Sequence, residues 1–408
     1  MIKKNYSFLV FLLLLCSLNT LIVALNLDGL KNNYALGKHT ISLFIQLPYL
    51  TFVYILLLNF FKIDKNKSFI YSILSIIPSL LLLSKYFFNE LVFFEEDNFR
   101  YDKLAKYYLE NKTFVADSAF TIQPGYTYYL TIILLFFEEQ TRLTQILNIL
   151  VCFLFLRFFI NFISFYKFEK FEKYFVYYLI FGSTFFLSKN IIFCISEWLY
   201  ICLILLLPIL ITNKKFRLTA IFLGFAVLIR TNYFIILSLL SLTIFYFNKN
   251  KLNLLIYFLI TLIPLSHNLI FHDEYAFFIT NEYVDIAFHY AIFDNLKSFI
   301  VYTSNHLLSY FALSKVYINN NWTSTSFLIS IVSLPFFSFY FIFKFFKMNI
   351  TDKLSFLVII LTTLGVTYVF GWAYYPRFQI TNYLTVFIML ICLNILKDKY
   401  KLSFLDKI

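Results

Sequence analysis

Residues 191–247 read IIFCISEWLYICLILLLPILITNKKFRLTAIFLGFAVLIRTNYFIILSLLSLTIFYF. The stretch contains three apolar runs, at 191–211, 216–230 and 231–247, and a short polar turn joins the first two. Apolar runs of about 18 residues or more are typical of helices that cross a lipid bilayer. Because similar runs recur along the whole chain, the sequence predicts an all-α, polytopic transmembrane helical bundle.

The composition of the whole chain agrees with this prediction. Of its 408 residues, 61% are hydrophobic and 14% are charged, whereas soluble domains have about 45–50% apolar and about 25% charged residues. Several of the apolar runs are short, so tilted or half-crossing helices are an alternative for them. We place twelve spans, at 6–25, 41–61, 68–88, 143–165, 174–188, 191–211, 216–230, 231–247, 252–270, 324–346, 353–371 and 378–396.

The basic residues predict the orientation of the bundle. The segments that this arrangement places inside hold 20 of the 34 Lys and Arg residues but only 6 of the 22 acids, which is the asymmetry of the positive-inside rule. We therefore expect an integral plasma (inner) membrane protein with both termini in the cytoplasm. The same placement accounts for the net charge of +12 without a nucleic-acid partner. The five cysteines lie in apolar runs, without metal-ligand or disulfide spacing.

Two regions are expected on the outer side, at 89–142 and 271–323. Within the first, the apolar stretch 122–137 is short and has Pro and Gly near its start. If it crossed the membrane, the Lys-rich loop 166–173 would lie outside, against the charge rule. We therefore interpret 122–137 as a juxtamembrane helix at the outer interface. The aromatic stretch 285–320 is interrupted by charges, and we likewise interpret it as a segment that lies at the outer interface.

An acidic cluster at Glu95, Glu96 and Asp97 follows an apolar run and falls on the outer side. The positions Asp97, Tyr101, Ala105 and Leu109 are spaced four apart and share one face of a helix. A helix that starts just after the acids would hold them at its N-terminus, where the helix dipole favours negative charge. A carboxylate there could act as a general base. The alternative is that the acids only cap a surface helix.

Charged residues inside predicted spans are further candidates. Glu197 and Arg230 each lie in an apolar run, and ionised groups within spans are costly and often functional. Arg377 follows Pro376 at the outer end of the last span. An arginine at such a place suits a phosphate, because its planar fork donates two hydrogen bonds. The alternatives are that Glu197 pairs with Arg230, or that the arginines extend to the membrane surface.

The stretch IPLSHNLIFHDEY, at 263–275, brings His267 and Asn268 to the outer exit of a span. His272, Asp273 and Glu274 follow, but the five-residue separation of the two histidines is a poor spacing for metal ligands on a helix. We interpret the acids as loop residues and predict no metal site.

The order of these elements resembles the GT-C superfamily of membrane glycosyltransferases, and most closely the protein mannosyltransferases and the lipid A aminoarabinose transferase. In that group an acid in the first outer loop is followed four residues on by Tyr and then by Ala, matched here by Asp97, Tyr101 and Ala105. A PGYP-like element starts a juxtamembrane helix there, and this chain has QPGYTYYL at 123–130. Thr127 replaces the second proline.

The later elements of the superfamily follow in the same order. A Ser-Glu pair matches Ser196 and Glu197, and GFAVLIR at 224–230 is similar to the GLA-x-LTR element. The sequence PLSHN at 264–268 departs from the P-x3-RN pattern, because His267 replaces the arginine. Arg377 and Phe378 match an RY pair before the last helix. The resemblance covers about residues 68–396, so we expect 68–408 to be the glycosyltransferase core and 1–67 to be a transmembrane hairpin added at the N-terminus.

The resemblance implies a donor sugar carried on a polyprenyl phosphate, and a lipid, glycan or protein acceptor at the outer face of the membrane. Asp97 would be the base, with Glu96 as its nearest substitute, and Arg230 and Arg377 would neutralise the departing phosphate. Some relatives bind a divalent metal in this loop, but we favour a reaction without a metal or other cofactor. The implied substrate cavity includes Tyr101, Gln123, Tyr126, Glu197, His267 and Asn268.

Two other function classes remain open. A surface polysaccharide polymerase or ligase also has many helices and a large outer loop, but such enzymes tend to use paired arginines and not an acid in an early loop. A lipid or sugar transporter often has inverted repeats and charges near the membrane midplane. No internal repeat is evident in this sequence, and its charge clusters lie near the outer boundary.

Overall fold

The computed structural model describes residues 72–73, 76–77, 79–80, 83, 96–114, 124–137, 141–165, 191–192, 194, 196–248, 251–272 and 376–400. Within these residues all regular secondary structure is helical and no strand occurs, as the fold class predicts. The helices are α5 (Glu96–Asn111), α6 (Pro124–Phe136), α7 (Thr141–Phe165), α9 (Glu197–Thr212), α10 (Phe216–Ile229), η3 (Thr231–Tyr233), α11 (Phe234–Asn248), α12 (Lys251–Thr261), α13 (Ile263–His272) and α19 (Pro376–Tyr400).

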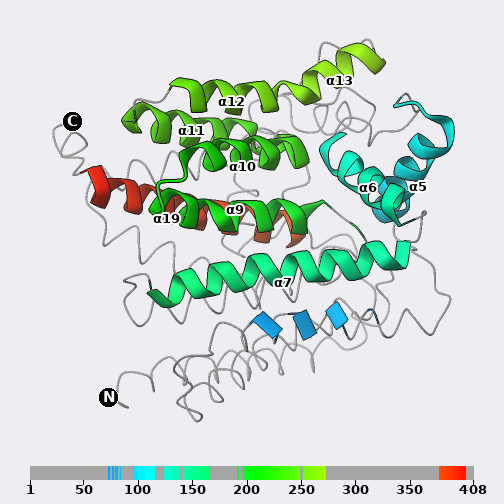
Figure 1. Ribbon diagram of the computed structural model, residues 1–408, viewed down its shortest axis with the longest axis horizontal. Coiled ribbons are helices and arrows are strands. Elements are labelled where there is room, and N and C mark those ends of the chain that lie inside the picture. Colours follow the sequence, from blue (N-terminus) through cyan, green and yellow to red (C-terminus); the bar gives the residue numbers. More distant parts are fainter. Residues whose placement is uncertain are drawn as a thin grey trace, which may run out of the picture.

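The helices α7, α9, α10, α11 and α12 run roughly along one direction and lie side by side in Figure 1. Helix α10 packs against α9 and α12, and α9 also packs against α7 and α19. Helices α5 and α6 lie together at one end of this stack, and α6 contacts α7, α10 and α13. The start of α9, the end of α10 and the start of α11 all lie toward that end (Figure 1).

The close packing of α10 on α12 depends on Gly224. A Cβ atom at this position would lie 2.7 Å from the Cβ of Ile260. Because real Cβ atoms do not approach other atoms so closely, only glycine lets the two helices come together at this distance. The helix pair therefore uses the small residue in GFAVLIR as a packing contact.

The turn between α9 and α10 is the polar stretch predicted at 213–217. The backbone amide of Asn213 donates to the carbonyl of Ile209 at 3.0 Å, and that of Lys215 donates to Leu210 at 2.9 Å. Lys214 takes up a positive φ of 58°, a conformation that terminates helices. The two helices are therefore antiparallel, as two consecutive apolar runs joined by a tight turn predict.

Two helical stretches, Leu143–Ile163 and Lys251–Phe271, are long and apolar enough to cross a membrane. Helices α9, α10 and α11 are apolar but have only 16, 14 and 15 residues. The described part of the chain therefore does not confirm the prediction of twelve full membrane spans. The expected spans at 6–25, 41–61, 174–188, 324–346 and 353–371, the hairpin 1–67 as a whole and the outer region 271–323 beyond His272 lie outside the described residues.

Several boundaries differ from the sequence prediction for local reasons. Helix α9 begins at Glu197 and not at 191, because Cys194 has a positive φ of 55° that interrupts the helix. The predicted span 252–270 is divided near Leu262 into α12 and α13, close to Pro264, whose ring disturbs the helix before it. Helix α5 begins at Glu96, within the acidic cluster instead of after it. The helix predicted at 122–137 is present as α6.

Candidate functional site

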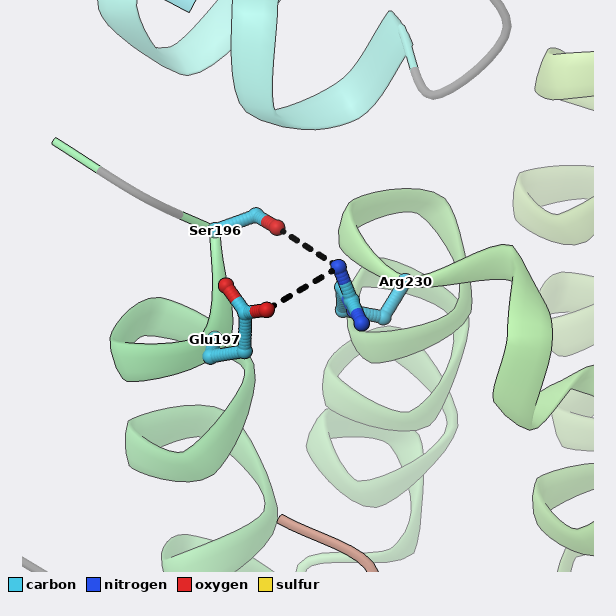
Figure 2. A network of polar contacts seen from close by, with 3 residues as sticks. All are labelled: Ser196, Glu197 and Arg230. Carbon is cyan, nitrogen blue, oxygen red and sulfur yellow. Dashed lines mark hydrogen bonds and ion pairs between the residues drawn. The ribbon is translucent and has the colours of Figure 1, made fainter. Parts of the chain in front are cut away.

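A buried ion pair joins the start of α9 to the end of α10 (Figure 2). Glu197 is 1% exposed and Arg230 is 5% exposed. The Nη1 atom of Arg230 lies 3.5 Å from Oε1 of Glu197 and donates a hydrogen bond of 3.2 Å to Oγ of Ser196. The pairing of these two charges was one of the alternatives that the sequence left open, and it is the arrangement that the structure has.

Local backbone structure places the two charges opposite each other. Arg230 ends α10 with φ −138° and ψ 85°, which is outside the helical region, and η3 follows it. Because α9 and α10 are antiparallel and joined by a tight turn, the first residue of α9 lies beside the last residue of α10. The ion pair is therefore a direct consequence of the helical hairpin.

The segment before Glu197 is held by polar side chains of α7. The Nε2 atom of Gln145 donates to the carbonyl of Ile192 at 2.7 Å. The Nδ2 atom of Asn148 contacts the carbonyl of Ile191 at 3.4 Å and Sγ of Cys194 at 3.5 Å. These contacts stabilise the left-handed conformation of Cys194, which costs free energy in a non-glycine residue. Sequence analysis missed both α7 residues, although buried amides in an apolar helix are a recognisable signal.

Aromatic side chains connect α5, α6 and the first turn of α9. Trp198, which follows Glu197, donates from Nε1 to the hydroxyl of Tyr126 at 3.1 Å. The ring of Tyr126 makes an edge contact with Tyr101 of α5, with centroids 5.1 Å apart. Tyr126 is fully buried and Tyr101 is 3% exposed. Two of the predicted cavity residues, Tyr101 and Tyr126, are thus brought together, and Trp198 joins them to the first turn of α9.

Helix α6 approaches the end of α10 very closely at Gly125. A Cβ atom at this position would lie 2.4 Å from the carbonyl oxygen of Leu228, two residues before Arg230. Only a glycine fits there, which gives the glycine of QPGYTYYL a structural reason. Gln123, which precedes Gly125 by two residues and is also a predicted cavity residue, lies outside the described residues.

His267 lies at a second contact of α6, with α13. Its Nδ1 atom is hydrogen-bonded to the hydroxyl of Tyr128, and its ring also contacts Phe271. Burial raises the pKa of Tyr128 to about 12, so this phenol keeps its proton at neutral pH. His267 and its neighbour Asn268 are 2% and 1% exposed. The histidine that departs from the P-x3-RN pattern therefore contacts helix α6.

The predicted base, Asp97, lies in the first turn of α5, as does Glu96. Their side chains are outside the described part of the structure. On the same helical face, Tyr101 is 3% exposed and Ala105 is fully buried, and this face packs on α6. Asp97 is one turn before Tyr101, so its position is on the face of α5 that meets α6.

Arg377 is the second residue of α19, which packs against α9, and its side chain also lies outside the description. Among the described residues there is no group of three or more His, Cys, Asp or Glu side chains that could hold a metal. No protein-family model, no curated protein and no solved structure matches this chain.

The arrangement is a buried cation with a carboxylate and a hydroxyl beside it, and a cluster of tyrosine and tryptophan rings begins in the same first turn of α9. Helix α6 crosses this end of the bundle and contacts α7, α10 and α13. An arginine in such a setting can bind an anion strongly, because low local polarity strengthens charge–charge interactions. Aromatic rings with polar tips suit a ligand that has apolar and polar parts.

Proposed function

We propose that this chain is a membrane glycosyltransferase, which moves a sugar from a polyprenyl-phosphate donor to a lipid, glycan or protein acceptor on the outer face of the membrane. The observation that carries the proposal is the buried Arg230, held beside Ser196 and Glu197 at the end of the bundle where α5 and α6 lie. A buried guanidinium next to juxtamembrane helices is suited to a phosphate that enters laterally from the lipid.

In the proposed reaction Asp97 removes the proton from the acceptor hydroxyl or amine as that group attacks the anomeric carbon. The bond between this carbon and the phosphate oxygen breaks, and the configuration of the carbon is inverted. The bonding electrons leave with the lipid phosphate, and Arg230 and Arg377 neutralise its growing charge. The step requires no metal, because one carboxylate accepts the proton and two guanidinium groups stabilise the negative charge of the leaving phosphate.

The proposed substrate cavity lies between α5, α6, α9 and α13. Tyr101 and Tyr126 form part of its aromatic wall, and the contact of Tyr128 with His267 joins α6 to α13 beside it. The hydroxyl groups of a sugar are suited to the polar tips of these side chains, and the polyprenyl chain is suited to the apolar helix faces. Asn268, the next residue of α13, is 1% exposed and adds a buried amide to this helix.

The proposal is tested by mass spectrometry of lipid-linked sugars in cells from which the gene has been deleted. We expect a sugar-loaded polyprenyl monophosphate to accumulate and one sugar to disappear from an envelope glycoconjugate. Complementation with the wild-type gene should reverse both changes: the donor should return to its normal level and the sugar should reappear on the glycoconjugate. Complementation with Asp97→Asn should reverse neither change. Recovery with Asp97→Asn but not with Arg377→Ala would favour a polymerase or ligase. If the amount of sugar-loaded polyprenyl monophosphate is unchanged in the deletion strain, a transporter is favoured.

A further inference from the structure

The contact between Glu197 and Arg230 is loose for a buried ion pair (Figure 2). The Nη1–Oε1 distance is 3.5 Å, compared with about 2.7–2.9 Å in a well-formed charge-assisted hydrogen bond. A buried pair repays the loss of hydration of its charges only when its geometry is good. A long contact between two nearly inaccessible charges therefore leaves room for a better anion to take the place of the carboxylate.

The hydroxyl of Ser196 is also used in an unusual way. Ser196 occupies the N-cap position of α9, but its side chain makes no capping hydrogen bond. A serine in this position usually stabilises a helix by accepting a hydrogen bond from a backbone amide, a contribution of about 1 kcal/mol. Here Oγ accepts a hydrogen bond from Arg230 instead. Two side chains from the start of α9 are thus directed at the same guanidinium nitrogen.

We propose that Glu197 is a displaceable counter-ion of Arg230, and that it selects the charge of the phosphate bound there. This inference rests on the proposed function and concerns the same site. Without ligand, the carboxylate neutralises the buried guanidinium. When a phosphate binds, its oxygens replace the carboxylate as partners of the guanidinium. Glu197 remains nearby, and its negative charge repels the negative charge of the phosphate. Glu197 thereby weakens binding in proportion to the negative charge of the phosphate.

The charges of donor and product give this effect a direction. Arg230 and Glu197 together have a net charge of zero. A sugar-bearing phosphodiester adds one negative charge, whereas the released lipid monoester carries about −1.5 to −2 at pH 7, as a phosphoserine does. Repulsion from Glu197 is therefore about twice as large for the product as for the donor. The carboxylate favours retention of the donor and release of the product.

The test uses two matched probes, dodecyl phosphate and its methyl diester, and the purified full-length protein in a non-ionic detergent. Isothermal titration calorimetry gives the affinity of each probe for the wild type and for Glu197→Gln. We expect this variant to bind the monoester about tenfold more tightly and the diester about threefold more tightly, because Coulomb energy scales with the ligand charge. Arg230→Gln should lose both affinities.

Glu110→Gln is the matched control. Glu110 is an exposed carboxylate of α5, so this variant changes the net charge of the protein equally but should leave both affinities unaltered. If Glu197→Gln does not fold, Arg377→Gln decides the matter: with only Arg230 and Glu197 left at the phosphate, this variant should bind the diester at least as tightly as the monoester. A strong preference for the monoester would overturn the inference.

Other outcomes would also overturn it. These are equal or weaker binding of both probes by Glu197→Gln, an equal gain for the two probes, and no binding of either probe by the wild type. A failure of the proposed function is distinguishable from these, because it is measured as sugar transfer. If the probes bind as expected but no sugar is transferred, the counter-ion role stands and the transferase assignment falls.

Discussion

At the residue scale, Gly125 is the position where helix α6 and the end of α10 leave no space for a side chain. Replacement by alanine would place a Cβ atom 2.4 Å from a backbone oxygen of Leu228. Because backbone cannot rotate away as a side chain can, α6 or α10 must shift. We expect Gly125→Ala to destabilise the protein by about 1–3 kcal/mol, the usual range for overpacking, and to reduce sugar transfer.

Thermal unfolding of purified Gly125→Ala in detergent measures this effect. Leu135→Ala is a suitable control, since Leu135 lies on the same helix but is 65% exposed. The control should unfold at the wild-type temperature. An unchanged midpoint for Gly125→Ala would show that α6 does not approach α10 as closely as described.

The Glu197–Arg230 pair makes a second prediction at this scale. Removal of one partner leaves the other as an isolated buried charge, which costs about 3–5 kcal/mol. We expect Glu197→Gln and Arg230→Gln each to lower the unfolding temperature in the absence of ligand. The double variant should be more stable than the sum of the single effects predicts, because no uncompensated charge remains. Strictly additive effects of the two substitutions would argue against the pair.

At the scale of single elements, α6 is anchored by the hydrogen bond between Tyr126 and Trp198. Tyr126→Phe would leave the buried indole Nε1 of Trp198 without its acceptor. An unsatisfied buried donor costs about 1–3 kcal/mol, so we expect this variant to unfold at a lower temperature. Tyr107→Phe is the control, because Tyr107 is 40% exposed. A wild-type midpoint for Tyr126→Phe would contradict the anchoring role.

The sequence predicted α7, α10 and α11 well, because each is a continuous apolar run bounded by polar residues. It did not predict the start of α9. The residues IIFCIS are as apolar as the helix that follows, and composition alone cannot show that Cys194 leaves the helical conformation. The break between α12 and α13 could have been anticipated from Pro264, since a proline inside an apolar run disturbs the preceding turn.

The candidate site was predictable only in part for a similar reason. Glu197 and Arg230 attract attention as charges in apolar runs, and their pairing follows once the hairpin of α9 and α10 is known. The roles of Gln145 and Asn148 depend on α7 lying beside residues 191–194. That proximity is a tertiary contact between segments more than 40 residues apart, and no spacing within either segment encodes it.

At the scale of the whole molecule, the distribution of basic residues predicts which ends of the helices face the cytoplasm. The turn between α9 and α10 should be inside, and the end of α5 should be outside. We expect Lys215→Cys to react with a membrane-impermeant maleimide only after the membrane is permeabilised, and Glu110→Cys to react in intact cells. Both positions are exposed. Labelling of both from the same side would contradict the predicted topology.

The measurement that tests the central claim most directly is sugar transfer by the purified protein. Wild-type protein and Asp97→Asn are reconstituted in vesicles that contain a polyprenyl-phosphate sugar, radiolabelled in the sugar, together with an extract of envelope acceptors. We predict that the wild type moves the label to an acceptor and releases the polyprenyl phosphate, and that Asp97→Asn inserts normally but loses transfer. If the label stays on the donor with the wild type, the protein is not this transferase; if Asp97→Asn transfers at the wild-type rate, Asp97 is not the base.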